Sequence, residues 1–312
     1  MIRLLALLLA AILAGLVYGE VHLPLSAIRQ WDGAAELLIG VIRAPRVAVA
    51  VLAGAAFGLA GALLQSLLRN PLASPDVLGF TSGAGLGAML VVALGGGAFS
   101  VTLGAASGGV LAALAITALS WKGGIVPLRM ILVGIGAAFT LQAITQFMMT
   151  RLTEAEAVEA ARWLSGSLAA RHWGHAFQIG LCLALLLPLA ALSLRALRLL
   201  ELGDEVATGL GLHITRARAG IAALAVALVA SAVAVAGPVP FVALLAGPLA
   251  ARFGAPMLTG AAVVGAVVTV LADLAARGLI DGVQLPLGVM TGILGAPYLL
   301  WMLSREMERG RL

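Results

Sequence analysis

The chain has 312 residues, of which 62% are hydrophobic and 11% are charged, and its mean hydropathy is +1.11. Because a soluble domain carries about 25% charged residues, this composition excludes a soluble enzyme and a disordered chain. The net charge of +5 comes from 18 arginines and one lysine spread along the sequence, so nucleic acid is not an expected partner. We predict an all-α integral membrane protein in contact with membrane lipid.

Apolar runs recur along the chain, and a helix needs about 20 apolar residues to cross a bilayer. The clear runs are Leu4–Val17, Val47–Leu67, Val77–Leu94, Phe99–Leu119, Pro127–Met149, Ala176–Leu194, Ala219–Ala236 and Met257–Ala276. Two shorter runs are Val239–Ala251 and Leu287–Leu303. With both counted, the sequence predicts ten transmembrane helices in a single domain, residues 1–312. No small-x-small cleavage site follows the first run, so we expect an uncleaved first span rather than a signal peptide.

Basic residues indicate the orientation, because loops rich in lysine and arginine stay in the cytoplasm. With a cytoplasmic N-terminus, twelve basic residues fall on the cytoplasmic side and seven on the outer side. The outer seven are Arg29, Arg43, Arg46, Arg151, Arg162, Arg171 and Arg277. This bias predicts a multi-pass protein of the cytoplasmic membrane with both termini in the cytoplasm.

The sequence lacks the usual signatures of an enzyme. Its single lysine, Lys122, follows Trp121 and belongs to no phosphate-binding G-x-x-x-x-G-K-[ST] loop, so the chain itself is not expected to hydrolyse ATP. His172 and His175 are three residues apart with no cysteine nearby, and we interpret them as an interfacial polar turn rather than a metal site. No catalytic, cofactor or metal residue is predicted.

One acidic residue, Asp273, lies inside a predicted span, where an acid is a functional candidate by default. Arg277 follows four residues later, a spacing that lets a helix pair the two side chains. We favour a structural role for Asp273. Proton coupling in a secondary carrier is the alternative.

Two further segments carry polar residues. The fifth run contains a stripe of Thr140, Gln142, Thr145 and Gln146, which predicts either hydrogen bonds between helices or the lining of a path for a large polar solute. The segment Leu202–Leu212 begins with Asp204 and Glu205, which favour a helix N-terminus, and Gly209 and Gly211 mark the end of that short helix. Such a helix lies on the membrane or contacts a cytoplasmic partner, and composition favours neither.

Several segments, in order, resemble the FecCD-type permeases of binding-protein-dependent ABC importers, which carry ferric siderophores, haem or cobalamin. The matching segments are Arg43-Ala44-Pro45-Arg46, Arg69–Gly79, Leu202–Leu212, Gly237–Val242, Gln284–Gly292 and Gly295-Ala296-Pro297. Arg69–Gly79 is the most distinctive of them. One departure is Leu249, which stands where the family commonly has histidine, so no role of that histidine is transferred.

The resemblance implies a type II ABC importer permease fold and transport by alternating access. The implied partners are a second permease subunit (a paralogue or an identical copy), two ATP-binding subunits, and a periplasmic or lipid-anchored substrate-binding protein. ATP and Mg²⁺ would bind to the ATP-binding subunits, with no cofactor on this chain.

The resemblance also implies three groups of site residues. Docking of the binding protein would use Arg43, Arg46 and Arg277. The coupling segment, about 199–214, would contact the ATPase through Leu202, Gly203, Asp204, Glu205, Ala207 and Gly211. The stripe Thr140, Gln142, Thr145 and Gln146 would line the translocation path. Ser74–Phe80 and Leu200–Glu205 look most like the ferric enterobactin branch, so a catecholate siderophore is the expected cargo, with haem and cobalamin as alternatives.

Overall fold

The computed structural model describes residues 1–19, 33–122, 124, 126–279 and 283–308. Its regular elements are helices, which confirms the all-α prediction. They are α1 (Ile2–Val17), α3 (Gly33–Ala35), η1 (Glu36–Arg43), α4 (Ala44–Leu68), α5 (Phe80–Ala93), α6 (Ala98–Ser120), α7 (Pro127–Met149), α8 (Glu154–Leu164), α9 (Trp173–Glu201), α10 (Asp204–Gly209), α11 (Ile214–Ala236), α12 (Val242–Arg252), α13 (Met257–Gly278) and α14 (Leu287–Glu308). Three of the basic residues counted for the orientation, Arg29, Arg309 and Arg311, lie outside the described residues.

Each predicted apolar run contains a helix, although α5 and α12 begin three residues inside their runs, at Phe80 and Val242, and the helices differ in length. Six segments among the described residues are long and apolar enough to cross a membrane, and the longest is Gly33–Leu68, where η1 leads directly into α4. The apolar parts of α1, α5, α12 and α14 are shorter, at 10–17 residues. Length and composition therefore support six spans, and ten spans stay a prediction.

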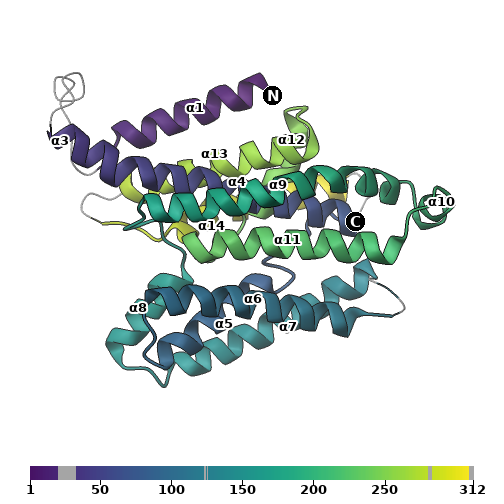
Figure 1. Cartoon of the computed structure of the whole chain (residues 1–312), viewed down its shortest axis with the longest axis horizontal. Helices are drawn as coiled ribbons and strands as arrows, with labels where there is room; N and C mark the ends of the chain where they lie inside the picture. The colour runs from purple at the N-terminus through teal and green to yellow at the C-terminus, as the bar shows by residue number, and fades with distance from the viewer. Residues whose placement is uncertain (20–32, 123, 125, 280–282, 309–312) are drawn as a thin grey trace.

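Helix α4 is the centre of the larger group of helices and packs against α9, α11, α12 and α13 (Figure 1). Glycines on α4 permit this close packing. A Cβ atom on Gly58 would lie 2.1 Å from the carbonyl oxygen of Ala261, and one on Gly61 would lie 1.9 Å from that of Ala243. In lipid, small residues at helix contacts allow the backbones to approach closely.

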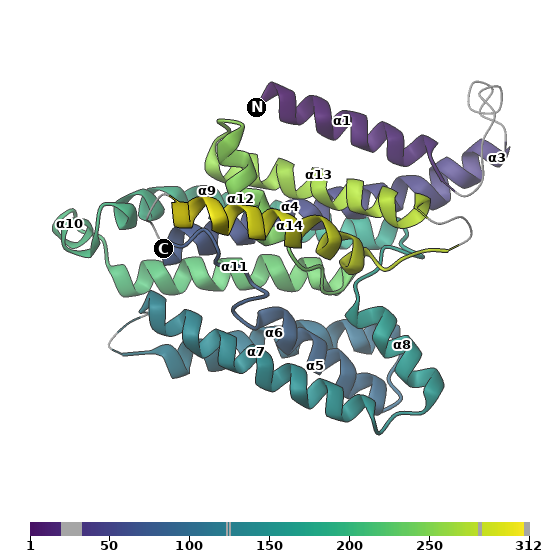
Figure 2. The same cartoon turned by 180° about the vertical axis from the view of Figure 1, so that it is seen from behind.

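Helices α5 to α8 form a second group beside the first (Figures 1 and 2). The contact between α5 and α6 also depends on glycine, since a Cβ on Gly87 would lie 2.1 Å from the carbonyl oxygen of Gly104. Helix α11 packs against both α4 and α6, so it joins the two groups.

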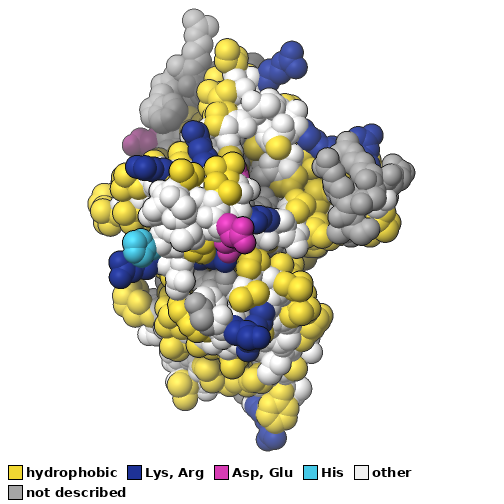
Figure 3. Space-filling view, turned by 90° about the vertical axis from the view of Figure 1, so that its right-hand side faces the viewer, with side chains coloured by type: hydrophobic (Ala, Val, Ile, Leu, Met, Phe, Trp, Pro, Cys, Tyr) yellow, Lys and Arg dark blue, Asp and Glu magenta, His cyan; other side chains and the backbone are white. Residues whose placement is uncertain are grey.

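The short helix α10 projects at one end of the molecule, while α3 and α8 lie at the opposite end (Figure 1). α1 begins and α14 ends on the side that faces α10 (Figure 2). Viewed onto the α10 end, acidic side chains lie among arginines and hydrophobic side chains (Figure 3). Neither α8 nor the helical lead-in to α4 was expected from the apolar pattern.

Candidate functional site

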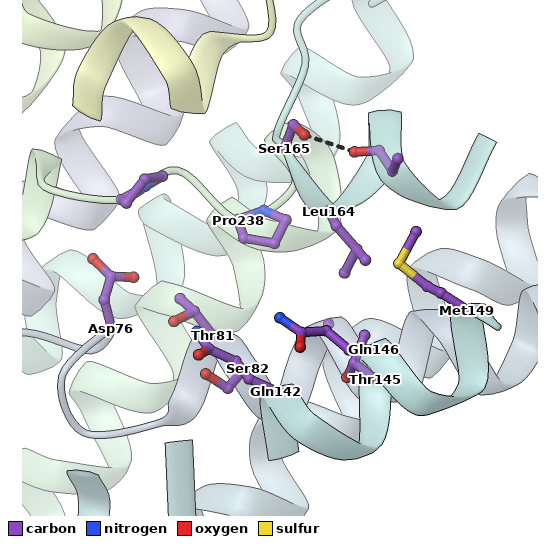
Figure 4. A pocket seen from close by; sticks show the side chains of 13 residues that line it. Asp76, Thr81, Ser82, Gln142, Thr145, Gln146, Met149, Leu164, Ser165 and Pro238 are labelled. Carbon is purple, nitrogen blue, oxygen red and sulfur yellow. Dashed lines mark hydrogen bonds between the residues drawn. The ribbon is translucent and has the colours of Figure 1, made fainter. Parts of the chain in front are cut away.

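A cavity of about 530 Å³, with several polar side chains in its wall, lies between the two groups of helices (Figure 4). Its walls come from α5, α7, the end of α8 and the segment before α12. The lining residues are Asp76, Thr81, Ser82, Gly85, Gln142, Thr145, Gln146, Met149, Ala161, Leu164, Ser165, Pro238 and Pro240. Asp76 is the only charged side chain among these, so hydroxyl and amide groups supply the rest of the polarity.

The cavity brings together three members of the predicted polar stripe. Gln142, Thr145 and Gln146 line it, and the Thr145 hydroxyl also donates to the Leu141 carbonyl at 2.8 Å. Thr140 is exposed elsewhere, and its hydroxyl donates to Gly136 at 2.8 Å. Two residues along an α-helix turn a side chain by roughly 200°, so Thr140 and Gln142 face opposite ways.

Two short helices begin at the cavity, and both begin after a residue with positive φ. Gly79 (φ 77°) precedes α5 and Phe241 (φ 67°) precedes α12. The carboxylate of Asp76 accepts a hydrogen bond from the Phe241 N–H at 3.3 Å and another from the Thr81 hydroxyl. One acid thus serves the N-terminal ends of two helices, where negative charge is favourable.

Asp76 was named in the sequence only as part of a family segment. A signal for it was available, because an acid directly before an apolar run falls near a helix N-terminus buried among other spans. Its partner on α12 lies 165 positions away, and no local pattern indicates that contact.

The end of α8 closes one side of the cavity through Ala161, Leu164 and Ser165. A capping box fixes the start of this helix, since the Thr153 N–H and hydroxyl both donate to Glu156, at 2.9 and 2.7 Å. These hydrogen bonds lower the pKa of Glu156. The spacing of Thr153 and Glu156 is the usual capping-box signature, and it could have revealed α8 in the sequence.

The predicted coupling segment forms α10 and its flanks. Gly203 (φ 106°) and Gly211 (φ 83°) bend the chain on either side, in a conformation that glycine adopts without strain. Within α10, Ala207 is fully buried on the inner side, whereas Glu205 is exposed. The hydrophobic side chains of Leu202, Val206 and Leu210 are 61%, 50% and 57% exposed. Together these three residues form an apolar outer face, called the α10 face below.

The Asp204 side chain is partly exposed and also contacts the helices beside α10. Its Oδ1 accepts hydrogen bonds from Arg218 Nη2 at 2.9 Å and from Arg69 Nη2 at 3.3 Å. Arg218 is buried and lies on α11, and Arg69 ends α4. Asp204 therefore attaches α10 to two transmembrane helices.

Of the three arginines predicted to dock a binding protein, Arg46 and Arg277 pair with Asp273, and Arg43 contacts the end of α1. These three arginines and Asp273 are called the arginine cluster below. Asp273 accepts from Arg46 through both carboxylate oxygens and pairs with Arg277 at 3.1 Å. The predicted Asp273–Arg277 pair is therefore confirmed. Arg43 donates to the carbonyls of Leu16 and Val17 at 3.1 and 2.6 Å.

Burial limits what the arginine cluster offers to a partner. Arg43 is 4% exposed, Arg277 8%, and the Arg46 side chain 13%. The cluster joins α1, α4 and α13 within the chain. The docking role of these arginines stays a prediction.

His172 and His175 cap a helix. The His172 ring accepts from the Gly174 N–H at 3.1 Å at the start of α9, and the two rings lie 4.0 Å apart. Within the described part of the chain, no group of three or more potential metal ligands occurs. Leu249, the departure from the family pattern, packs partly buried in α12 against the core.

Comparison with known proteins gives consistent matches over nearly the whole chain. Residues 7–305 match the FecCD transport family. The ferric enterobactin transport system permease protein FepG of Escherichia coli is 40% identical, over 86% of this chain and 82% of FepG. The achromobactin transport system permease protein CbrC of Dickeya dadantii is 36% identical, over 97% and 90% of the two chains. The Fe(3+)-citrate import system permease protein YfmE of Bacillus subtilis is also 36% identical, over 89% and 85%.

Solved structures give the same fold. A metal-chelate type ABC transporter in an inward-facing conformation matches with a TM-score of 0.86 and 28% identity, over 97% of this chain and 98% of that one. A more distant match, PsaBC from Streptococcus pneumoniae, has a TM-score of 0.56 at 16% identity and shares the fold alone.

Proposed function

The chain belongs to the FecCD transport family, and on that premise we propose that it is the permease subunit of an ATP-driven importer for a ferric siderophore. Membership confirms the resemblance seen in the sequence. The family comprises multi-pass permeases of iron-chelate transport systems, which are transport subunits rather than enzymes. Translocation across the cytoplasmic membrane would occur by alternating access through ten transmembrane helices, with both termini in the cytoplasm.

The cavity and the polar groups in its wall are the observation that carries this proposal. It combines amide and hydroxyl groups from α5 and α7 with the starts of two short helices, inside an otherwise apolar bundle. Irregular backbone and polar groups are tolerated at membrane depth where they line a cavity. Gln142 and Gln146 present donors and acceptors without adding charge, which suits a large polar chelate better than a bare ion.

The second permease subunit, an identical copy or a paralogue, would complete the path. Much of α7 and α9 is exposed and apolar: only 22% and 17% of their most apolar windows are buried. Lipid and the second subunit would cover these surfaces.

Two ATP-binding subunits would contact α10 from the cytoplasm and hold ATP and Mg²⁺. The α10 face offers the apolar area that a protein interface needs at its centre. A periplasmic or lipid-anchored binding protein would deliver substrate at the opposite side, where Arg43, Arg46 and Arg277 lie. In this proposal the three arginines exchange their contacts within the chain for contacts with carboxylates of the binding protein.

The cargo is proposed to be a catecholate siderophore. The relative with 40% identity carries ferric enterobactin by its name, while others are named for achromobactin or ferric citrate. Haem and cobalamin are the alternatives. Proton coupling through Asp273 is disfavoured, because Asp273 is paired with two arginines and does not line the cavity.

Substrate-stimulated ATP hydrolysis by the reconstituted complex tests the proposal. The permease is combined with its ATP-binding and substrate-binding subunits, and ferric catecholates, ferric hydroxamates, ferric citrate, haem and cobalamin are compared. We expect ferric catecholates to stimulate hydrolysis most. If no ATPase associates and uptake follows the proton gradient instead, the importer assignment is wrong.

A further inference from the structure

The segment Arg69–Gly79, called the connector below, joins the end of α4 to the start of α5. Arg69 ends α4 with φ 49°, and its guanidinium donates to the Leu200 carbonyl and pairs with Asp204 at 3.3 Å. Leu200 precedes the bend at Gly203, and Asp204 follows it. One end of the connector is therefore attached to both sides of the hinge that carries α10.

The other end of the connector forms part of the cavity wall. Asp76 bonds the start of α12 at Phe241 and the start of α5 at Thr81, as described above. Leu78 packs on α7 so closely that a Cβ on Gly134 would lie 2.9 Å from the Leu78 Cα. A displacement of this end moves the starts of α5 and α12 relative to α7.

Between its ends the connector is stiffened by its own hydrogen bonds. The Asn70 side chain accepts from Leu72 N–H at 2.8 Å, and the Ser74 carbonyl accepts from Leu78 N–H at 3.0 Å. Two prolines, Pro71 and Pro75, fix backbone dihedrals within it. A segment restrained in this way passes a displacement on rather than absorbing it.

A second contact ties the connector to α12. The Gln65 side-chain amide donates to the carbonyls of Pro71 and Leu244, each at 3.0 Å. The connector and the first turns of α12 are thus held together at Pro71–Leu244 and at Asp76–Phe241. Both contacts lie on the route from α10 to the cavity.

The Arg69–Asp204 pair is suited to a part that moves. Its side chains are 45% and 46% exposed, and an ion pair this exposed contributes little to the stability of a fold. Arg218, which is buried, also holds Asp204. Loss of the Arg69 contact should therefore alter the transmission of movement more than the stability of the fold.

We propose that the connector transmits the ATP-driven movement of α10 to the cavity, with Arg69 and Asp76 as positioning residues at its two ends. This inference rests on the proposed function, since it requires ATPase subunits bound at α10. The contacts on Leu200 and Asp204 couple Arg69 to the hinge. The contacts on Thr81 and Phe241 couple Asp76 to the helices that border the cavity.

The test follows the accessibility of the cavity in the full reconstituted complex. Cys182, the single cysteine of the chain, is replaced by alanine, and Ser82→Cys places a thiol in the cavity wall. The rate of its modification by a small water-soluble thiol reagent is measured without nucleotide and with a non-hydrolysable ATP analogue. In the parent we expect the nucleotide to change this rate at least fivefold.

Arg69→Ala and Asp76→Asn should each reduce the nucleotide response to less than twofold while the ATPase subunits still co-purify. Arg69→Lys keeps the charge but loses the planar guanidinium, whose Nη2 donates to both Leu200 and Asp204, and should give an intermediate response. Arg198→Ala is the matched control, because Arg198 is exposed on the last turns of α9 near α10. It should respond like the parent.

The outcomes separate the two hypotheses. If the parent binds no ATPase or shows no nucleotide response, the proposed function fails and the connector proposal fails with it. If nucleotide changes the modification rate in the parent, and changes it equally in Arg69→Ala and Asp76→Asn, the connector proposal alone is overturned. If the Arg69→Ala permease does not assemble with the ATPase subunits, the other two variants decide. The connector proposal is then overturned if Arg69→Lys and Asp76→Asn each show the same nucleotide response as the parent.

Discussion

Arg46 and Asp273 lie 227 positions apart in the sequence and meet in a two-point ion pair, with Arg46 Nε and Nη2 both within 3.0 Å of one carboxylate oxygen. The pair joins α4 to α13, and Arg277 on the same turn of α13 completes it. Arg277 also donates to the Tyr18 carbonyl at 3.4 Å, and Arg43 donates to the two residues before it. The surplus positive charge of the cluster therefore stabilises the carbonyl end of α1.

Replacing Asp273 by asparagine should destabilise the protein strongly. The change leaves buried arginines without their counter-charge, and breaking a buried ion pair from one side costs about 3–5 kcal/mol. We expect a clearly lower midpoint of thermal unfolding for the purified complex in detergent. Arg46→Lys, which keeps the charge but loses one hydrogen bond, should lower it less. Equal midpoints for Asp273→Asn and the parent would contradict a structural role.

The sequence predicted the helices well because apolar runs are local. It also predicted the Asp273–Arg277 pair, since residues four apart share one face of a helix. It did not predict Arg46 as the stronger partner of Asp273, because no pattern within one sequence reports a contact between distant helices. The docking hypothesis placed these arginines on the outer side but could not indicate their burial.

The cavity was predicted in part, for a geometric reason. Residue type alone placed Thr140 with Gln142, although their positions turn them to opposite faces of α7. The capping box that begins α8 is local and was available in the sequence. The contact from Asp76 to Phe241 at the start of α12 could not be predicted, because it joins segments 165 positions apart.

The α10 face should carry much of the binding energy for the ATPase. Val206→Asp places a charge in the centre of this proposed interface, and loss of an interfacial hot spot costs about 2 kcal/mol or more, which is roughly 30-fold in affinity. We expect at least that loss in binding of the ATP-binding subunits, measured with the permease in nanodiscs. Thr208→Ala, on the same exposed helix, is the control and should bind within about threefold of the parent.

Gln146→Leu should weaken transport by removing hydrogen-bonding groups from the cavity wall while nearly preserving side-chain size. Loss of one or two hydrogen bonds to a polar cargo costs about 1–3 kcal/mol, so the substrate concentration giving half-maximal uptake should rise about 5- to 150-fold. Thr140→Val, on the same helix but outside the cavity, should leave it unchanged. Equal effects of the two variants in vesicle uptake would remove α7 from the path.

Gly58→Ala should force α4 and α13 apart. The added methyl group would lie 2.1 Å from the Ala261 carbonyl oxygen, which is backbone and cannot turn aside. Overpacking of this kind costs about 1–3 kcal/mol, so we expect a lower midpoint of thermal unfolding in detergent. The arginine cluster also joins α4 to α13, so Gly58→Ala and Asp273→Asn act on the same helix contact. The loss of stability in the double variant should therefore be smaller than the sum of the two single losses.

Gly220→Ala is the matched control for this prediction. Gly220 lies in α11, and a Cβ built there meets no atom within 4 Å. Alanine is favoured over glycine in a helix interior by up to about 1 kcal/mol, so this variant should unfold at the same temperature as the parent or slightly higher. If the two glycine variants shifted the unfolding midpoint in the same direction by the same amount, helix propensity rather than close packing would explain both, and the contact between α4 and α13 would not require glycine.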